Sequence, residues 1–348
     1  MISIHTFELT LETNSKDFNY LLSRAYKMAK KHGNRVGYST KHTSNDVRVD
    51  DSLASYGIMI EYHNCDYRKM VKFRINPSEV LGGNDLQLWV PNKKNIKTVI
   101  KLLDDHIFCY FDYCYKLNDL MLTRVEFTAN LNVGKENVSA YINLMHKIGK
   151  VKKFSNKYSK SDFSADKINK NHSFDLEGNT NGIAFTVYDK EADLKKKGKE
   201  NKARKAEGIL RIEIRLKKRK TVQQAINDFA GDDDLTTKQQ IKLMAKNSRR
   251  IFFATFVDIV PYGDFYRLKD AERIVAGSDF KKHQKDKMLR LLRLIPEKKS
   301  LYLAMKELNV RNINDVLEWF AKLGVSPITI SKRTDADFLK NLYSYLDK

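Results

Sequence analysis

The sequence predicts an α+β fold in which a mixed or antiparallel central sheet is flanked by helices and followed by a small helical domain. Segments whose apolar residues alternate, as in strands, are interleaved with segments whose apolar residues recur at helical spacing. Beyond residue 275 helical patterns dominate. A chain of 348 residues with 42% hydrophobic residues is long enough for two domains. We place the boundary in 262–280 and expect domains at 1–262 and 275–348.

The first third of the chain shows strand patterns separated by two helical ones. Gly33 follows the first helical pattern and Pro77 ends the fourth strand pattern, as expected of residues that end such elements. The segment after Pro77 is typical of a turn with a short helical piece. The expected strands are 2–12, 35–40, 56–63 and 70–77, and the expected helices are 15–32 and 94–115.

The middle of the chain continues this alternation. Residues 150–181 are rich in Lys, Ser and Asn, which indicates an extended basic hairpin or a mobile loop. The apolar run 252–260 fits a strand or a buried helix, because periodicity alone does not separate the two. The other expected strands are 120–133, 182–191 and 208–218, and the expected helices are 136–149, a basic helix or linker through 206, 221–230 and 236–249.

The charge of the chain indicates a polyanionic partner. Lys and Arg number 64 against 43 acidic residues, a net charge of +21. Nucleic acid is the favoured partner, because neutralising phosphates releases counterions. An anionic membrane surface and charge for solubility alone are the alternatives. No apolar run approaches a membrane span, the N-terminus is not typical of a signal peptide, and three cysteines form no disulfide framework. We therefore expect DNA as partner, no membrane, and a cytoplasmic location in a host cell.

Two expected strands carry a carboxylate two residues after an arginine. Arg124 and Glu126 share one face of the strand 120–133, and Arg211 and Glu213 share one face of the strand 208–218. Carboxylates inside a sheet are costly to bury without a partner, so the pair suggests a site for a hard cation with oxygen ligands. Arginine–glutamate pairs satisfied within the sheet are the alternative. The sequence has no phosphate-binding P-loop and no two histidines separated by a single residue.

A second group of polar residues ends the strand 182–191. Tyr188 and Lys190 are two residues apart, so they would share a face, and Asp189 and Glu191 flank them. A phenol becomes a nucleophile when a metal or another cation stabilises the phenolate, and a lysine can neutralise a phosphate oxygen. The pattern is therefore compatible with phosphoryl transfer. A strand-end tyrosine with a solvated hydroxyl is the alternative.

Basic segments surround this strand in the sequence and indicate contacts with DNA. Aromatic residues, among them Phe154 and Tyr158, are interleaved with the lysines of 147–170, and such rings can stack unpaired bases. A solvated charged surface is the alternative. The residues expected to contact DNA are Arg124, Lys152, Lys153, Lys157, Lys160, Lys196, Lys197, Arg211, Lys217 and Lys218.

Together these segments resemble the gene II/X family of phage and plasmid rolling-circle replication initiators. The pieces occur in the family's order, and they are also similar to plasmid initiators that lack the paired histidines. The resemblance covers about residues 57–330, with gaps. It is carried by RINPSEVLGG (74–83), LTRVEFTANL (122–131), GIAFTVYDKEADLK (182–195) and GILRIEIRLKKR (208–219).

The resemblance implies a set of roles for these residues. Tyr188 matches the nicking tyrosine, Lys190 the lysine two places on, and Glu213 the second carboxylate. Glu126 stands where the family often has Asp, and Lys72 stands where a relative carries a carboxylate, so the resemblance implies no third ligand from that position. Glu126 and Glu213, with Asp189 or Glu191, would hold Mg²⁺ or Mn²⁺.

The implied reaction is a transesterification at an origin of replication. Tyr188 would become linked to the 5′-phosphate, the freed 3′-OH would prime a host polymerase, and the ends would later be rejoined. The domain 1–262 would nick the DNA, and the domain 275–348 would bind origin duplex or form a homodimer. A host helicase is a further expected partner. Tyr158 is a candidate second nucleophile. The alternatives are a conjugative relaxase with the same chemistry, a non-catalytic DNA- or RNA-binding regulator, and a metal-dependent nuclease that uses water.

Overall fold

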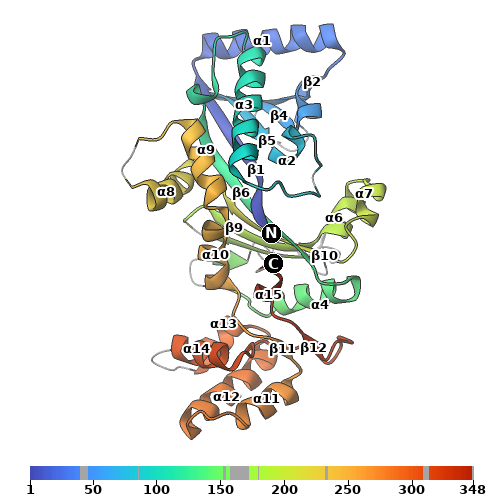
Figure 1. Ribbon diagram of the computed structural model, residues 1–348, viewed down its shortest axis with the longest axis vertical. Helices are drawn as coiled ribbons and strands as arrows, with labels where there is room; N and C mark the ends of the chain where they lie inside the picture. The colour runs from blue at the N-terminus through green and yellow to red at the C-terminus, as the bar shows by residue number, and fades with distance from the viewer. Residues whose placement is uncertain are drawn as a thin grey trace. The chain divides into compact units, whose positions relative to one another are not determined.

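The computed structural model of the protein has an α+β fold, as the sequence predicts (Figure 1). It describes residues 1–39, 46–84, 86–151, 154–156, 172–178, 180–231, 234–308 and 313–346. Ten strands form the main sheet in the order β2-β3-β4-β5-β1-β6-β10-β9-β8-β7. The pairings β1–β5, β2–β3, β3–β4, β4–β5, β7–β8 and β8–β9 are all antiparallel.

The chain divides into two compact units, which we describe separately. The N-terminal unit comprises Ile2–Thr128 and Arg215–Ile251. The C-terminal unit comprises Met1, Ala129–Ile214 and Phe252–Lys348. Residues 252–348 therefore cluster with 129–214, and the units do not divide at 262–280. The functional division into 1–262 and 275–348 stays a prediction.

The N-terminal unit contains the strands and helices that the sequence predicts, in the predicted order, and also the strand β3, which the sequence analysis does not predict. The strand and helix at 2–12 and 15–32 are observed at Ile2–Thr13 and Ser15–His32, and Gly33 ends the helix in the left-handed conformation. The elements are β1 (Ile2–Thr13), α1 (Ser15–His32), β2 (Val36–Tyr38), β3 (Asp46–Asp50), η1 (Ala54–Tyr56), β4 (Ile58–Cys65), β5 (Arg68–Ile75), α2 (Pro77–Val80), α3 (Lys93–Tyr110), η2 (Leu117–Asp119), β6 (Met121–Asn132), α8 (Arg219–Ala230) and α9 (Thr237–Lys246).

The core of this unit lies between helices and one face of its strands. Alternation in β5 places Val71, Phe73 and Ile75 on the buried face. The Phe73 ring packs edge-on against Tyr110 and Phe111, with centroids 5.7 and 5.4 Å apart. Helix α3 ends at Tyr110, earlier than the expected residue 115, because Asp112 and Tyr113 take positive φ angles that a helix does not accommodate.

The C-terminal unit contains the second half of the sheet and the helical tail. Strands β6 and β10 run from one unit into the other. The elements are α4 (Lys135–His146), β7 (Phe154–Asn156), β8 (Ser173–Gly178), β9 (Ile183–Asp189), α6 (Lys190–Lys196), α7 (Glu200–Arg204), β10 (Ile209–Leu216), α10 (Ser248–Ile259), β11 (Phe265–Tyr266), α11 (Leu268–Ala276), α12 (Lys282–Lys298), α13 (Leu301–Leu308), α14 (Ile313–Leu323), β12 (Phe338–Leu339) and α15 (Tyr343–Leu346).

The ambiguous apolar run 252–260 belongs to the helix α10. Phe252, Phe256 and Ile259 are buried and follow the i, i+4, i+7 spacing of one helical face. The rings of Phe252 and Phe256 stack with centroids 5.6 Å apart, and Phe256 meets Tyr343 near the C-terminus at 4.9 Å. The Tyr343 hydroxyl donates to the Val260 carbonyl at 2.5 Å, so the end of the chain is part of this core.

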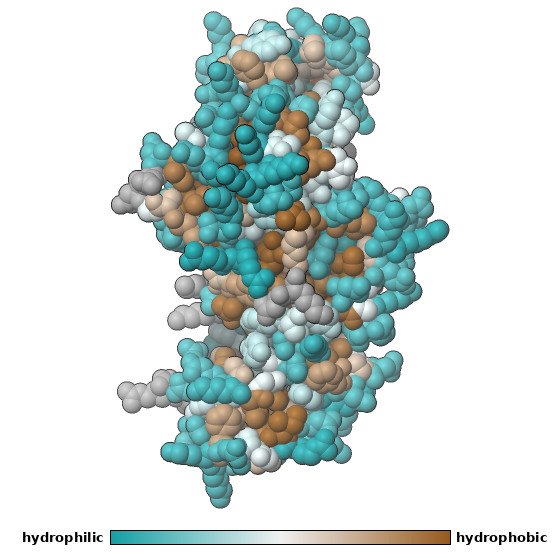
Figure 2. All heavy atoms as spheres, viewed as in Figure 1, coloured by the Kyte–Doolittle hydropathy of each residue, from teal (hydrophilic) through white to brown (hydrophobic). Residues whose placement is uncertain are grey.

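The surface of the molecule is rich in hydrophilic side chains, and Figure 2 shows them over much of the face in view. Within the part of the chain that the structure describes, no helix combines the length and apolar character needed to cross a membrane. This agrees with the absence of a long apolar run in the sequence.

Candidate functional site

The first half of the candidate site lies on β1 and β6. Along β6 the apolar Val125, Phe127 and Ala129 lie on one face, and Arg124, Glu126 and Thr128 lie on the other. His5 lies on β1, and its Nδ1 is 2.9 Å from Glu126 Oε1. Arg124 Nη2 donates to Glu126 Oε2 at 3.3 Å. The shared face of Arg124 and Glu126 is therefore confirmed, and the Arg124 guanidinium is paired with Glu126. Its contact with DNA stays a prediction.

The Glu126 carboxylate is buried and held in its ionised form. Burial by itself raises its pKa, but the hydrogen bond and charge of His5 together with the charges of Arg215 and Arg74 outweigh burial and lower the pKa to about 2. A buried carboxylate that is ionised at neutral pH is a suitable ligand for a hard cation.

This pKa predicts how stability depends on pH. Because the folded-state pKa of about 2 lies below the ordinary 4.5, the stabilisation is complete above about pH 4.5 and is lost as the pH falls toward 2. We expect Glu126→Gln to remove a contribution on the order of 3 kcal/mol at pH 5 to 6 and almost none near pH 2. Urea unfolding of both proteins across this range measures the difference, and parallel pH curves would contradict it.

The second half of the site lies on β9 and β10. The Tyr188 hydroxyl on β9 donates to Glu213 Oε1 on β10 at 2.6 Å. Burial of the Tyr188 phenol and the negative charge of Glu213 raise the pKa of Tyr188 well above 10, while Arg211 opposes the rise. Arg211 is fully buried on β10, and its Nε donates to Asn130 at 2.7 Å. Tyr188 is thus a protonated phenol whose proton already points to a carboxylate oxygen.

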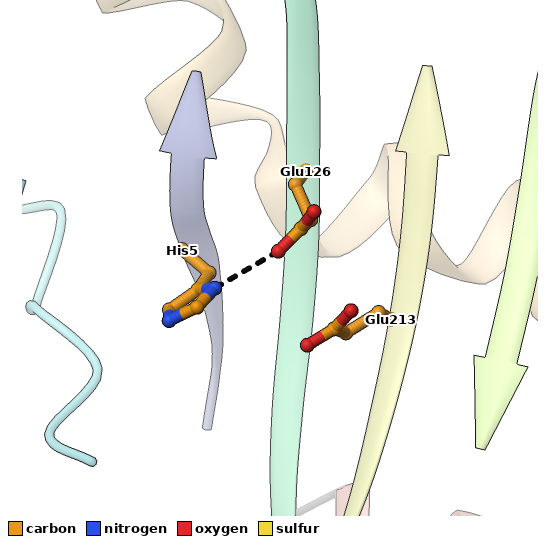
Figure 3. Close-up of side chains that lie close together, drawn as sticks. All are labelled: His5, Glu126 and Glu213. Atoms are coloured by element: carbon orange, nitrogen blue, oxygen red, sulfur yellow. Dashed lines mark hydrogen bonds and ion pairs between the residues drawn. The ribbon is translucent and has the colours of Figure 1, made fainter. Parts of the chain in front are cut away.

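His5, Glu126 and Glu213 form a group that could hold a metal ion. One ligand atom from each of the three lies within 4.8 Å of the others, and Figure 3 shows their side chains pointing toward one another from β1, β6 and β10. Ligands on opposite sides of an ion with bonds of about 2.2 Å are about 4.4 Å apart, so small side-chain adjustments suffice. One imidazole and two carboxylates are donors that suit a divalent cation.

The two other expected metal ligands lie outside this group. Helix α6 begins at Lys190, immediately after Tyr188 and Asp189, so the strand ends earlier than the expected residue 191. Asp189 caps this helix and accepts a hydrogen bond from the Ala192 amide at 3.1 Å. Glu191 is paired with Lys195 at 2.7 Å. Both carboxylates therefore serve the start of α6.

Lys190 is buried close to the tyrosine ring. Its ammonium lies 3.2 Å from Asp193 and 5.9 Å from the centroid of the Tyr188 ring. The expected proximity of Lys190 and Tyr188 is thus present, although Lys190 lies in a helix and not on the strand. Its charge is shared with Asp193, whose pKa is lowered because hydrogen bonds and charges from Lys197 and Lys190 outweigh burial.

Apart from Arg124, the residues expected to contact DNA fall into three sets. Arg211 is fully buried, which corrects its expected role as a surface contact. Lys196, Lys197, Lys217 and Lys218 are exposed. Lys152, Lys153, Lys157 and Lys160, like Tyr158, lie outside the described residues.

His5 is the residue of this site that the sequence analysis did not select. Histidine spacing along the chain does not indicate a metal site, since His5 has no histidine partner nearby in sequence. One signal was available: an ionisable side chain in the middle of a strong strand pattern, as at Glu126 and Glu213, indicates a polar face that needs a partner.

Comparison of the sequence with protein-family models and with curated proteins gives no match. The resemblance to the gene II/X initiators is therefore carried by the four short segments alone.

Proposed function

We propose that this protein nicks one strand of DNA at an origin by tyrosine transesterification, as rolling-circle replication initiators do. The observation that carries the proposal is the hydrogen bond between the Tyr188 hydroxyl and Glu213, a carboxylate that also belongs to the candidate metal group. A nucleophile, a proton acceptor and ligands for a cation are the parts that this reaction requires. The net charge of +21 supports a nucleic acid as substrate.

Each residue of the site has a separate role in the proposed reaction. Glu213 accepts the phenol proton from Tyr188, the phenol oxygen attacks phosphorus, and the bond to the 3′ oxygen breaks. The 3′ oxygen takes up a proton from water, and the 5′-phosphate stays linked to Tyr188. Arg211 stabilises the phenolate by its charge, which already opposes the high pKa of Tyr188. Mg²⁺ or Mn²⁺ held by His5, Glu126 and Glu213 would supply positive charge to the phosphate and the phenolate.

The experiment that tests the proposal detects the covalent intermediate. Supercoiled plasmid carrying the DNA that flanks the coding sequence is incubated with the protein and Mn²⁺, with and without EDTA, and resolved on a denaturing protein gel. We expect an adduct that requires metal and is absent for Tyr188→Phe. Tyr67→Phe, at a fully exposed tyrosine outside the site, is the matched control and should behave as wild type.

Two other outcomes would replace the proposal. Cleavage without an adduct would indicate a nuclease that uses water. Binding without cleavage, unaffected by EDTA and by Tyr188→Phe, would indicate a regulator. A conjugative relaxase would give the same adduct and is distinguished by a substrate at a transfer origin.

Removal of the imidazole ligand gives a further prediction about the metal. We expect His5→Ala to weaken binding of Mn²⁺ by at least about 10- to 100-fold, the loss typical even for groups that only support a ligand. Affinity should also rise with pH, because imidazole binds a metal only when neutral. Titration calorimetry measures the affinity, and His172→Ala, at an exposed histidine beside Asp189, is the control. Equal losses in both variants would argue against the group.

A further inference from the structure

Exposed tyrosines and lysines gather on α1 and on the edge strand β2 of the N-terminal unit, apart from the residues of the candidate site. The side chains of Tyr38, Tyr20 and Tyr26 are 72%, 58% and 42% exposed. In Figure 2, hydrophilic side chains dominate the top of the view, where Figure 1 places α1. We call these residues the aromatic–basic patch, which comprises Tyr20, Tyr26, Lys27, Lys30, Lys31 and Tyr38.

Arg48 of β3 holds two of these rings in place. Its Nε donates to the Tyr26 hydroxyl at 3.2 Å, and its guanidinium carbon lies 3.3 Å from the centroid of the Tyr38 ring. Tyr38 and Arg48 are directly opposite each other in the β2–β3 pairing, and Arg48 is also paired with Asp46. Rings fixed in this way lose little conformational entropy when a ligand stacks on them.

The charge around the rings is positive. The one acidic residue of α1 is Asp17, which lies in the first turn and accepts a hydrogen bond from the Asn14 side chain, while the lysines gather toward the other end. Among the described residues, Lys27, Lys30 and Lys31 make no ion pair. Tyr20 and Tyr26 are six residues apart on the helix, about 9 Å along its axis.

We propose that the aromatic–basic patch binds a single-stranded nucleic acid outside the nicking site. Lysines without a carboxylate partner contact backbone phosphates, and exposed rings stack unpaired bases, which a duplex does not offer. The identification of the strand as DNA rests on the proposed function; the preference for unpaired strands does not. The patch would hold a strand that has been opened or displaced.

Fluorescence anisotropy of the full chain with labelled thirty-nucleotide oligo(dT) tests the proposal, in EDTA so that no cleavage occurs. We expect Tyr38→Ala to weaken binding by about 5- to 100-fold, because one stacked base is lost, and Tyr38→Phe to bind as wild type. Lys27→Gln/Lys30→Gln/Lys31→Gln should reduce the slope of log affinity against log salt by about 2. Lys93→Gln/Lys94→Gln/Lys97→Gln removes the same charge from exposed positions of α3 and should leave affinity nearly unchanged.

Several results would overturn the inference. One such result is an unchanged affinity of the Tyr38→Ala variant for oligo(dT), and another is an equal loss of affinity in the two lysine triples. A third is that the patch variants lose as much affinity for a duplex of the same length. A fourth is that they lose binding to phosphatidylserine vesicles but not to oligo(dT). Melting temperatures show whether each variant is folded. Failure of the proposed function is a separate result. If the wild-type protein does not nick DNA, the patch variants should still lose affinity for oligo(dT). If the protein nicks DNA but the patch variants bind oligo(dT) as wild type does, only the patch proposal is refuted.

Discussion

Glu213→Gln is expected to reduce nicking by at least about 1000-fold while leaving the protein folded. The amide oxygen can still accept the hydrogen bond from Tyr188, so the local packing is retained. It carries no charge, however, and therefore neither takes up the phenol proton nor provides an anionic ligand. A loss of this size is typical when groups that act as a unit lose one member.

A single-turnover assay with labelled origin DNA measures this loss, and a matched variant shows where it comes from. Glu191→Gln removes a carboxylate that the sequence analysis placed among the metal ligands but that the structure pairs with Lys195. We expect this variant to nick at close to the wild-type rate. If Glu191→Gln is as damaging as Glu213→Gln, the ligand group of His5, Glu126 and Glu213 is not the one used.

Phe73→Ala is expected to cause the largest loss of stability, about 3–5 kcal/mol. Phe73 is fully buried on β5, and its ring meets Tyr110 and Phe111 of the core edge-on. Truncation removes these contacts and leaves a cavity that a sheet paired on both sides of β5 closes poorly.

Urea unfolding followed by circular dichroism measures the change. Tyr67→Ala removes an aromatic side chain of similar size from a fully exposed turn and should alter the free energy of unfolding by less than about 0.5 kcal/mol. A Phe73→Ala protein as stable as the Tyr67→Ala protein would show that this part of the core is not well packed.

Local patterns in the sequence sufficed for most elements of the fold. The helix 15–32 is observed at Ser15–His32, because its apolar spacing, the Asn14 cap and Gly33 all act within the segment. The strand 120–133 is observed at Met121–Asn132 for the same kind of reason. The run 252–260 could not be assigned to a helix or a strand. Nearly all of its residues are apolar, so the spacing of apolar residues shows neither the period of a helix nor that of a strand.

For the candidate site, the sequence predicted only which residues on the same strand share a face. Alternation placed Arg124 with Glu126 and Arg211 with Glu213, and the polar end of the strand 182–191 drew attention to Tyr188. Asp189 and Glu191 were expected to face the same site, but the chain changes from strand to helix at Lys190, and both side chains serve the helix start instead. Such a change within two residues reverses which side chains share a face.

By itself the sequence determined the α+β class, the strands that carry Glu126, Tyr188 and Glu213, and the strong positive charge, because these depend on composition and on neighbours along the chain. Only the tertiary structure showed which strands are neighbours: β1 lies beside β6, and β10 lies beside β9. That order pairs His5 with Glu126 and Tyr188 with Glu213, across 121 and 25 residues of sequence. Strand pairing at such separations is set by the packing of whole elements, which a local pattern does not record.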